Sequence, residues 1–154
     1  MLTLIARYGR YLALLVALTA TLTSLYFSLV LAWPPCDLCW YQRICMYPLV
    51  PILAVSLWRK SNDTEYYVLP LSLLGAGLAL YHYLIQKTTW LTPPICLSGV
   101  SCTTDYLNLF GFVTIPLLSF TAFLLISGLV IAAGWQSAND AEEETHTART
   151  QSNR

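Results

Sequence analysis

The stretch WPPCDLCWYQR, Trp33 to Arg43, separates two long apolar runs and carries a Cys-x-x-Cys pair, Cys36 and Cys39. Two cysteines at this spacing can close a disulfide, and a helix N-terminus or a nearby cation lowers the pKa of a thiol and makes it reactive. If a helix begins near Leu38, Cys39 and Arg43 lie four residues apart on one face. We therefore expect the Arg43 guanidinium to stabilise a Cys39 thiolate, and the stretch indicates thiol redox chemistry.

The composition around this stretch is that of a membrane protein. Of 154 residues, 56% are hydrophobic and 10% are charged, and the mean hydropathy is +0.58. Soluble proteins carry about 25% charged residues. Eight basic residues balance eight acidic ones, so no basic field indicates a nucleic-acid partner. Four of the five cysteines form two close pairs, a pattern that favours disulfides outside the cytosol.

Apolar runs recur four times, each near the length of about 20 residues that crosses a bilayer as a helix. We expect an all-α, antiparallel bundle of four transmembrane helices within one domain, 1–134, and a mostly disordered polar tail, 135–154. Gly75 and Gly77 in the third run predict close helix packing. A cleaved signal peptide is an alternative for the first run. The expected spans are about 11–33, 38–58, 66–85 and 112–134.

The basic residues near the span ends predict the orientation, because cytoplasmic loops carry an excess of Lys and Arg. Both termini should be cytoplasmic. The connections that carry the two cysteine pairs should then lie together at the outer face of the cell membrane. Arg7, Arg10, Arg59 and Lys60 fall on the cytoplasmic side of this arrangement, whereas Arg43 and Lys87 fall on the outer side.

The second cysteine pair, Cys96 and Cys102, lies in the loop PPICLSGVSC before the fourth run. Two pairs on one face can pass electrons by thiol–disulfide exchange. Such a relay needs a final acceptor, and a membrane quinone would reach a thiolate at bilayer level most simply. His82 and Gln86 share a helix face near the outer end of the third run and could line its head-group site. His82 could equally be an interfacial histidine without a catalytic role.

Other interpretations of the same residues remain open. The two pairs could be structural disulfides of a membrane scaffold. Four cysteines could bind zinc, but one Cys-x-x-Cys with one Cys-x5-Cys is looser than the usual zinc spacing, so we expect no metal site. Arg43 could snorkel to the interface or pair with Asp37. Cys45 faces away from Cys39 on a helix, and we expect it to be buried and inert.

The segment CDLCWYQRICMYPL, Cys36 to Leu49, resembles the first cysteine-pair segment of the DsbB family of bacterial disulfide bond formation proteins, especially its shorter BdbC-like branch. The four-span layout, the stretch LYHYLIQ from Leu80 to Gln86, and PPICLSGVSC extend the resemblance. It implies a quinone-dependent thiol oxidase of the bacterial inner membrane. The enzyme would reoxidise a soluble DsbA-like protein of thioredoxin fold and use ubiquinone or menaquinone.

The resemblance also implies an order of exchange. The reduced partner would attack Cys96, and Cys102 would then attack Cys36, leaving Cys39 as the thiolate that engages the quinone. The second pair is here only Cys-x5-Cys, and its loop is shorter than in the longer DsbB pattern. The sequence therefore does not decide whether a disulfide forms between Cys36 and Cys102 of the two loops. A vitamin K epoxide reductase-like quinone reductase is an alternative that WYQR favours less. Arg43, His82 and Gln86 would lie near the quinone head group.

Overall fold

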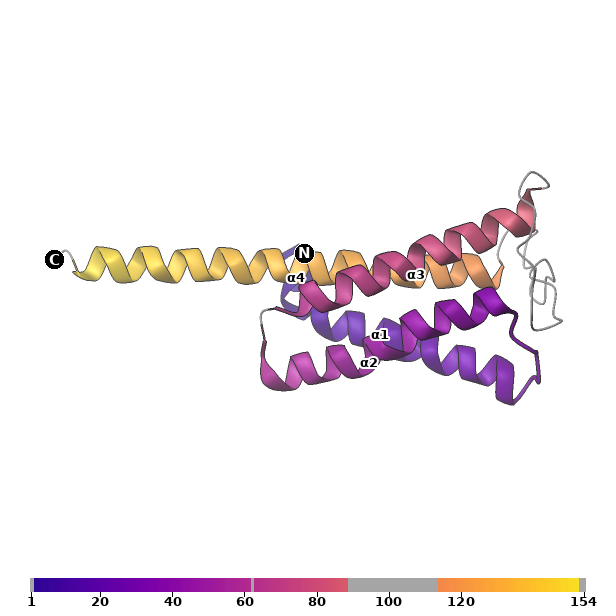
Figure 1. Ribbon diagram of the computed structural model, residues 1–154. Coiled ribbons are helices and arrows are strands. Elements are labelled where there is room, and N and C mark those ends of the chain that lie inside the picture. The colour runs from indigo at the N-terminus through magenta and orange to yellow at the C-terminus, as the bar shows by residue number, and fades with distance from the viewer. Residues whose placement is uncertain (1, 62, 89–113, 153–154) are drawn as a thin grey trace.

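The computed structural model describes residues 2–61, 63–88 and 114–152, and it consists of four long α-helices (Figure 1). Each helix contains a stretch long and apolar enough to cross a membrane. The prediction of an all-α, four-helix bundle is therefore confirmed. The helices are α1 (Leu2–Leu29), α2 (Asp37–Arg59), α3 (Thr64–Lys87) and α4 (Ile115–Ser152), and their apolar stretches are Tyr8–Leu29, Asp37–Arg59, Thr64–Lys87 and Ile115–Asn139.

The helices run antiparallel, so that the α1–α2 connection lies at the same end of the bundle as the last turn of α3 and the start of α4 (Figure 1). In the described residues, α1 packs against α2 and α4, and α3 packs against the same two helices, whereas α1 and α3 do not touch. Each helix thus packs beside the helices next to it in the chain, and α4 closes the bundle against α1. Cys36, at the start of α2, therefore lies near the end of α3.

The first helix ends before the expected boundary at residue 33. Its last residue is Leu29, and Ala32 has a left-handed φ of 52°. Pro34 and Pro35 follow, and a proline disfavours the helical conformation of the residue before it. The chain therefore leaves the helix early and reaches the cysteine pair in an irregular segment.

The bundle is apolar inside and outside, as a membrane protein should be. Leu49 and Leu53 of α2 and Phe123 of α4 are fully buried in the main core. Large apolar side chains also cover the outer surface, and Trp58 is 87% exposed. Such a surface would be costly in water but suits contact with lipid.

The two glycines of α3 have different surroundings. A Cβ on Gly75 would overlap the ring of Phe123, whereas a Cβ on Gly77 would meet nothing within 4 Å. Gly75 therefore permits the close approach of α3 and α4 that the sequence predicts. For Gly77 the packing prediction is wrong, because this residue faces away from the other helices.

The expected disordered tail differs from the structure, in which α4 continues as a helix through Ser152 and projects beyond the other helices (Figure 1). Residues 135–152 contain neither glycine nor proline, and Ala, Glu, Gln and Arg among them are good helix formers. Low hydrophobicity predicts the absence of a buried core there, but it does not prevent helix formation next to a long preceding helix.

Candidate redox site

The start of α2 positions the first cysteine pair. Cys36 is the N-cap residue, with φ −74° and ψ 170°, and its carbonyl accepts the first helical hydrogen bond, from the Trp40 amide at 3.1 Å. Cys39 lies three residues further, in the first helical turn. This geometry brings the two Sγ atoms to 3.0 Å. Both cysteines carry free thiols, close enough to form a disulfide after a small rotation.

Cys36 is enclosed between α2 and α3. Cys36 is only 4% exposed and packs with Leu38 and Ile85 in a small apolar cluster, separate from the main core, against which Cys39 and Tyr81 also pack. This cluster shields Cys36 from solvent and fixes its distance from α3.

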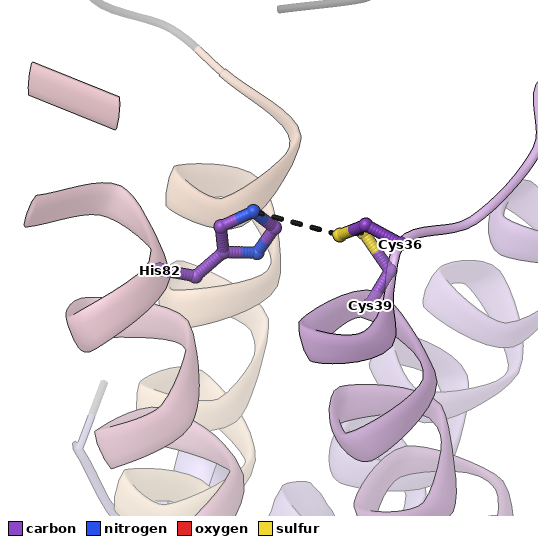
Figure 2. A group of neighbouring side chains, drawn as sticks. All are labelled: Cys36, Cys39 and His82. Carbon is purple, nitrogen blue, oxygen red and sulfur yellow. Dashed lines mark hydrogen bonds between the residues drawn. The ribbon is translucent and has the colours of Figure 1, made fainter. Parts of the chain in front are cut away.

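His82 of α3 is the polar side chain that faces this pair (Figure 2). Its Nε2 lies 3.8 Å from Cys36 Sγ, and its Nδ1 lies 3.0 Å from Gln42 Nε2. His82 is 1% exposed and Gln42 is 6% exposed. Because both side chains are buried, the hydrogen bond between them holds the imidazole in one orientation, with Nε2 toward the sulfur.

The electrostatic setting favours a thiolate at Cys36. The hydrogen bond with the Cys39 thiol lowers the pKa of Cys36 most, burial opposes this effect, and the hydrogen bond with His82 lowers it further, so that the pKa falls to about 4. The position at a helix N-terminus acts in the same direction. At neutral pH the pair therefore carries its negative charge chiefly on Cys36, the sulfur that faces α3.

A cavity of about 520 Å³ lies on the other side of the pair, between α1, α2 and α4. Cys39, Gln42, Arg43 and Tyr47 contribute polar groups to its lining from α2. Cys39 thus connects the thiol pair with a space large enough for a small organic molecule. Its apolar lining includes Leu15, Val16, Ala20, Phe27, Trp33, Met46, Ile115, Leu118, Ala122 and Leu125.

Arg43 holds one edge of this cavity against α1. Its Nη2 donates to the Ser24 carbonyl at 3.3 Å and also contacts the Ser28 hydroxyl. The guanidinium carbon lies 5.5 Å from the centre of the Trp40 ring, a cation–π distance. Its charge also interacts with the Cys39 thiol. The structure therefore puts Arg43 and Cys39 at the same cavity, on the helix face that their spacing indicates.

The remaining predicted residues lie elsewhere or outside the described part of the chain. His82 and Gln86 are both on α3, and neither belongs to the cavity lining, so their contact with a quinone stays a prediction. Cys96 and Cys102 fall within 89–113, outside the described residues. Cys45 is 3% exposed and packs in the main core, apart from the pair.

Gln42 is a residue of the site that the sequence pattern does not single out. It stands within WYQR, three residues after Cys39 and next to Arg43, and its amide is a polar group in a mostly apolar helix. A buried polar side chain needs a hydrogen-bond partner. That requirement is the signal that could have drawn attention to it, although His82 as the partner becomes apparent only in the fold.

A reactive thiol pair at the end of a helix that spans a bilayer serves thiol–disulfide exchange, so the fold and the site define a membrane disulfide-forming protein. The family model of the disulfide bond formation protein DsbB matches residues 6–135. This chain belongs to the DsbB family, which confirms the resemblance seen in the sequence.

Relatives named for the same process align over most of their length. The chain is 48% identical to a probable disulfide formation protein C 2 of Bacillus cereus over 126 residues, 82% of this chain and 91% of the relative. It is 48% identical to the disulfide bond formation protein C of Bacillus subtilis over 119 residues, 75% and 85% of the two chains. A probable disulfide formation protein of Chlamydia trachomatis is 44% identical over 126 residues, 82% and 92%. No solved structure matches the chain.

Proposed function

We propose that this protein reoxidises a soluble DsbA-like thiol oxidase by passing electrons through its two cysteine pairs to a membrane quinone. The observation that carries the proposal is the two-sided setting of Cys36 and Cys39. Cys36 faces His82 and α3, whereas Cys39 opens to the cavity that Arg43 borders. Such an arrangement suits a pair that exchanges disulfides on one side and transfers electrons on the other. The relatives' names support the direction of disulfide formation.

The cavity residues fit a quinone. Its volume of about 520 Å³ is in the usual range of ligand sites, roughly 300 to 1,000 Å³. Arg43 would hold a carbonyl oxygen of the head group, because a guanidinium donates strong hydrogen bonds to oxygen. The apolar side chains of α1 and α4 would contact the isoprenoid chain. Ubiquinone and menaquinone share these features, so both remain candidates.

The chain's own thiols supply the electrons. Closing the disulfide from the Cys36 thiolate and the Cys39 thiol forms one S–S bond and releases two electrons and one proton. The electrons and this proton would pass to a bound quinone, and its second proton would come from water. Burial of Cys36 limits the access of water to this step. His82, beside Cys36, would hold the negative charge of that sulfur whenever the pair is reduced.

The outer pair would connect this chemistry to the partner. In the proposed order, a thiolate of the reduced partner attacks Cys96 of the Cys96–Cys102 disulfide and releases Cys102. Cys102 then attacks Cys36 of the inner disulfide and releases Cys39 as a thiolate. The partner's second thiol resolves the mixed disulfide at Cys96 and releases Cys96 as a thiolate. Cys96 then attacks Cys102 of the Cys36–Cys102 bond, which restores the outer disulfide and releases Cys36, so that each cycle moves one electron pair to the inner pair. The positive-inside pattern supports an outer location for both pairs in the bacterial membrane.

The proposal can be tested by full turnover in detergent, with a soluble quinone analogue and a reduced DsbA-like protein. We expect wild-type protein to reduce the quinone and oxidise the partner in equal amounts. Cys39→Ser and Cys96→Ser should each abolish turnover. Cys45→Ser is the matched control, because Cys45 lies in the main core, and should turn over near the wild-type rate. A wild-type protein whose pairs stay oxidised while the quinone stays unreduced would instead be a disulfide-stapled scaffold.

A further inference from the structure

We propose that the reduced Cys36–Cys39 pair and His82 together form a binding site for one soft divalent cation of the zinc type. One potential ligand atom from each residue, two sulfurs and one imidazole nitrogen, lies within 4.8 Å of the other two (Figure 2). Thiolate and imidazole are the ligands that zinc prefers in proteins. The site would use the inner pair alone, and differs from the four-cysteine zinc site weighed in the sequence analysis.

The distances are close to those that a tetrahedral ion requires. With Zn–S bonds of about 2.3 Å and Zn–N bonds of about 2.0 Å, neighbouring donor atoms stand roughly 3.5 to 3.8 Å apart. Cys36 Sγ and His82 Nε2 are already separated by 3.8 Å. The two sulfurs, at 3.0 Å, would open by less than about 1 Å. Small side-chain rotations at Cys36 and Cys39 would therefore assemble three ligands and leave the fourth position for water or an exogenous ligand.

Gln42 prepares His82 for this role. Metal-binding histidines commonly donate their second ring N–H to an oxygen, which fixes the ring and its tautomer. The Gln42 amide lies 3.0 Å from His82 Nδ1, whereas Cys36 contacts the other ring nitrogen, Nε2. With the amide oxygen turned to Nδ1–H, the lone pair of Nε2 points toward Cys36. The same buried contact thus provides the second coordination shell.

Charge balance favours the ion in the reduced state. Two thiolates 3.0 Å apart repel each other in a buried setting, whereas two thiolates and one divalent cation are neutral together. A disulfide has no thiolate to offer, so oxidation of the pair would remove the site. It follows that the ion would bind only the reduced pair and would inhibit its oxidation, a consequence that rests on the proposed function.

Cadmium titration of purified protein tests the site directly, because Cd²⁺ bound to thiolate absorbs in the ultraviolet. The starting protein is a Cys96→Ser/Cys102→Ser double variant, in which the inner pair supplies the cadmium thiolates. We expect one Cd²⁺ per reduced chain and none per oxidised chain. In this background His82→Ala should weaken binding about tenfold or more, since it removes one ligand. Cys45→Ser should leave the titration unchanged.

Equal affinity of the His82→Ala chain would overturn the proposal, because it would show a plain dithiol site. Binding by the oxidised chain, or no binding at all, would overturn it too. If His82→Ala does not fold, cadmium NMR of the chain that retains His82 decides the question. A chemical shift for two sulfurs with a nitrogen supports the site, and one for sulfur and oxygen donors alone contradicts it.

This test is independent of the proposed electron transfer. Cadmium binding without any quinone reduction would leave the metal site intact and reject the relay. Quinone reduction without cadmium binding would support the relay and reject the metal site. If both hold, added Zn²⁺ should slow quinone reduction, and a chelator should restore the rate.

Discussion

Gln42 Nε2 and His82 Nδ1 lie 3.0 Å apart in a buried contact that joins α2 to α3 directly beside the thiol pair. A neutral imidazole has one donor nitrogen and one acceptor nitrogen. The amide of Gln42 therefore determines whether the other nitrogen offers a proton or a lone pair to Cys36. Gln42 is in this sense a positioning residue, which acts on the sulfur through His82.

Gln42→Leu tests this positioning role, because leucine has a similar volume but cannot bond to His82. An unsatisfied buried polar group costs about 1 to 3 kcal/mol, equivalent to roughly a 5- to 150-fold slower reaction if the cost falls on the reactive state. We expect turnover and alkylation of Cys36 to slow together, and Gln42→Glu to restore part of both.

A matched control for Gln42→Leu is Ser72→Ala, which removes the buried 2.8 Å hydrogen bond between Ser72 and Ser127 in another part of the bundle. Ser72→Ala should lower the stability of the protein without slowing turnover or the alkylation of Cys36. If turnover and alkylation slow equally in both variants, Gln42 stabilises the fold and does not position His82.

The pH dependence of thiol alkylation tests the charge on Cys36. A group with a lowered pKa keeps its thiolate down to that pKa, about 4 here, and loses it below. In metal-free buffer, Cys36 of the reduced protein should therefore react at a nearly constant rate between about pH 8 and pH 5. An ordinary thiol with a pKa near 8.5 would slow about tenfold per unit over most of this range. Such a tenfold slope at Cys36, located by mass spectrometry, would contradict the assignment.

Arg43→Ala tests the cavity as the quinone site. Arg43 borders the cavity, and its loss removes a charged hydrogen-bond donor worth about 1.5 to 3 kcal/mol. The KM for a soluble quinone should rise about tenfold or more, with the reaction toward the partner less affected. Lys87→Ala is the control, because Lys87 is a cation at the same end of the bundle but outside the cavity lining. Equal changes of KM in both variants would show that Arg43 does not bind the quinone.

Gly75→Ala and Gly77→Ala form a matched pair for the packing of α3. A Cβ at Gly75 would overlap Phe123, and overpacking costs about 1 to 3 kcal/mol. At Gly77 there is open space, and alanine favours the helix over glycine by up to about 1 kcal/mol. Thermal unfolding in detergent should show a lower Tm for Gly75→Ala and an equal or higher Tm for Gly77→Ala. The reverse order would contradict the packing of Phe123 on Gly75.

Much of the fold can be predicted from the sequence, because a bilayer imposes simple requirements on length and apolarity. The second and third spans, expected at 38–58 and 66–85, agree with α2 and α3 to within two residues at each end. The end of α1 and the helical continuation of α4 could not be predicted in this way. They depend on local backbone effects, at Pro34 in the first case and in a polar segment of good helix formers in the second.

The site could be predicted in part. The register of Cys39 and Arg43 follows from the helical period, and both residues do border one cavity. The contact of His82 with Cys36 could not be derived from spacing, because it depends on how α3 packs against α2. For the same reason the sequence pattern predicts a place for His82 near the quinone, but it does not predict contact of His82 with the thiols or with a metal ion.

In the proposed function, the inner pair passes its electrons directly to a quinone. The most direct measurement is a single turnover of the fully reduced Cys96→Ser/Cys102→Ser variant with a soluble quinone analogue, in metal-free buffer and without a partner protein. We expect one quinone to be consumed for every two thiols lost, and peptide mapping to find a Cys36–Cys39 disulfide. If the quinone is not consumed while both thiols remain free and accessible to alkylation, the inner pair does not donate electrons to a quinone, and the proposed function is wrong.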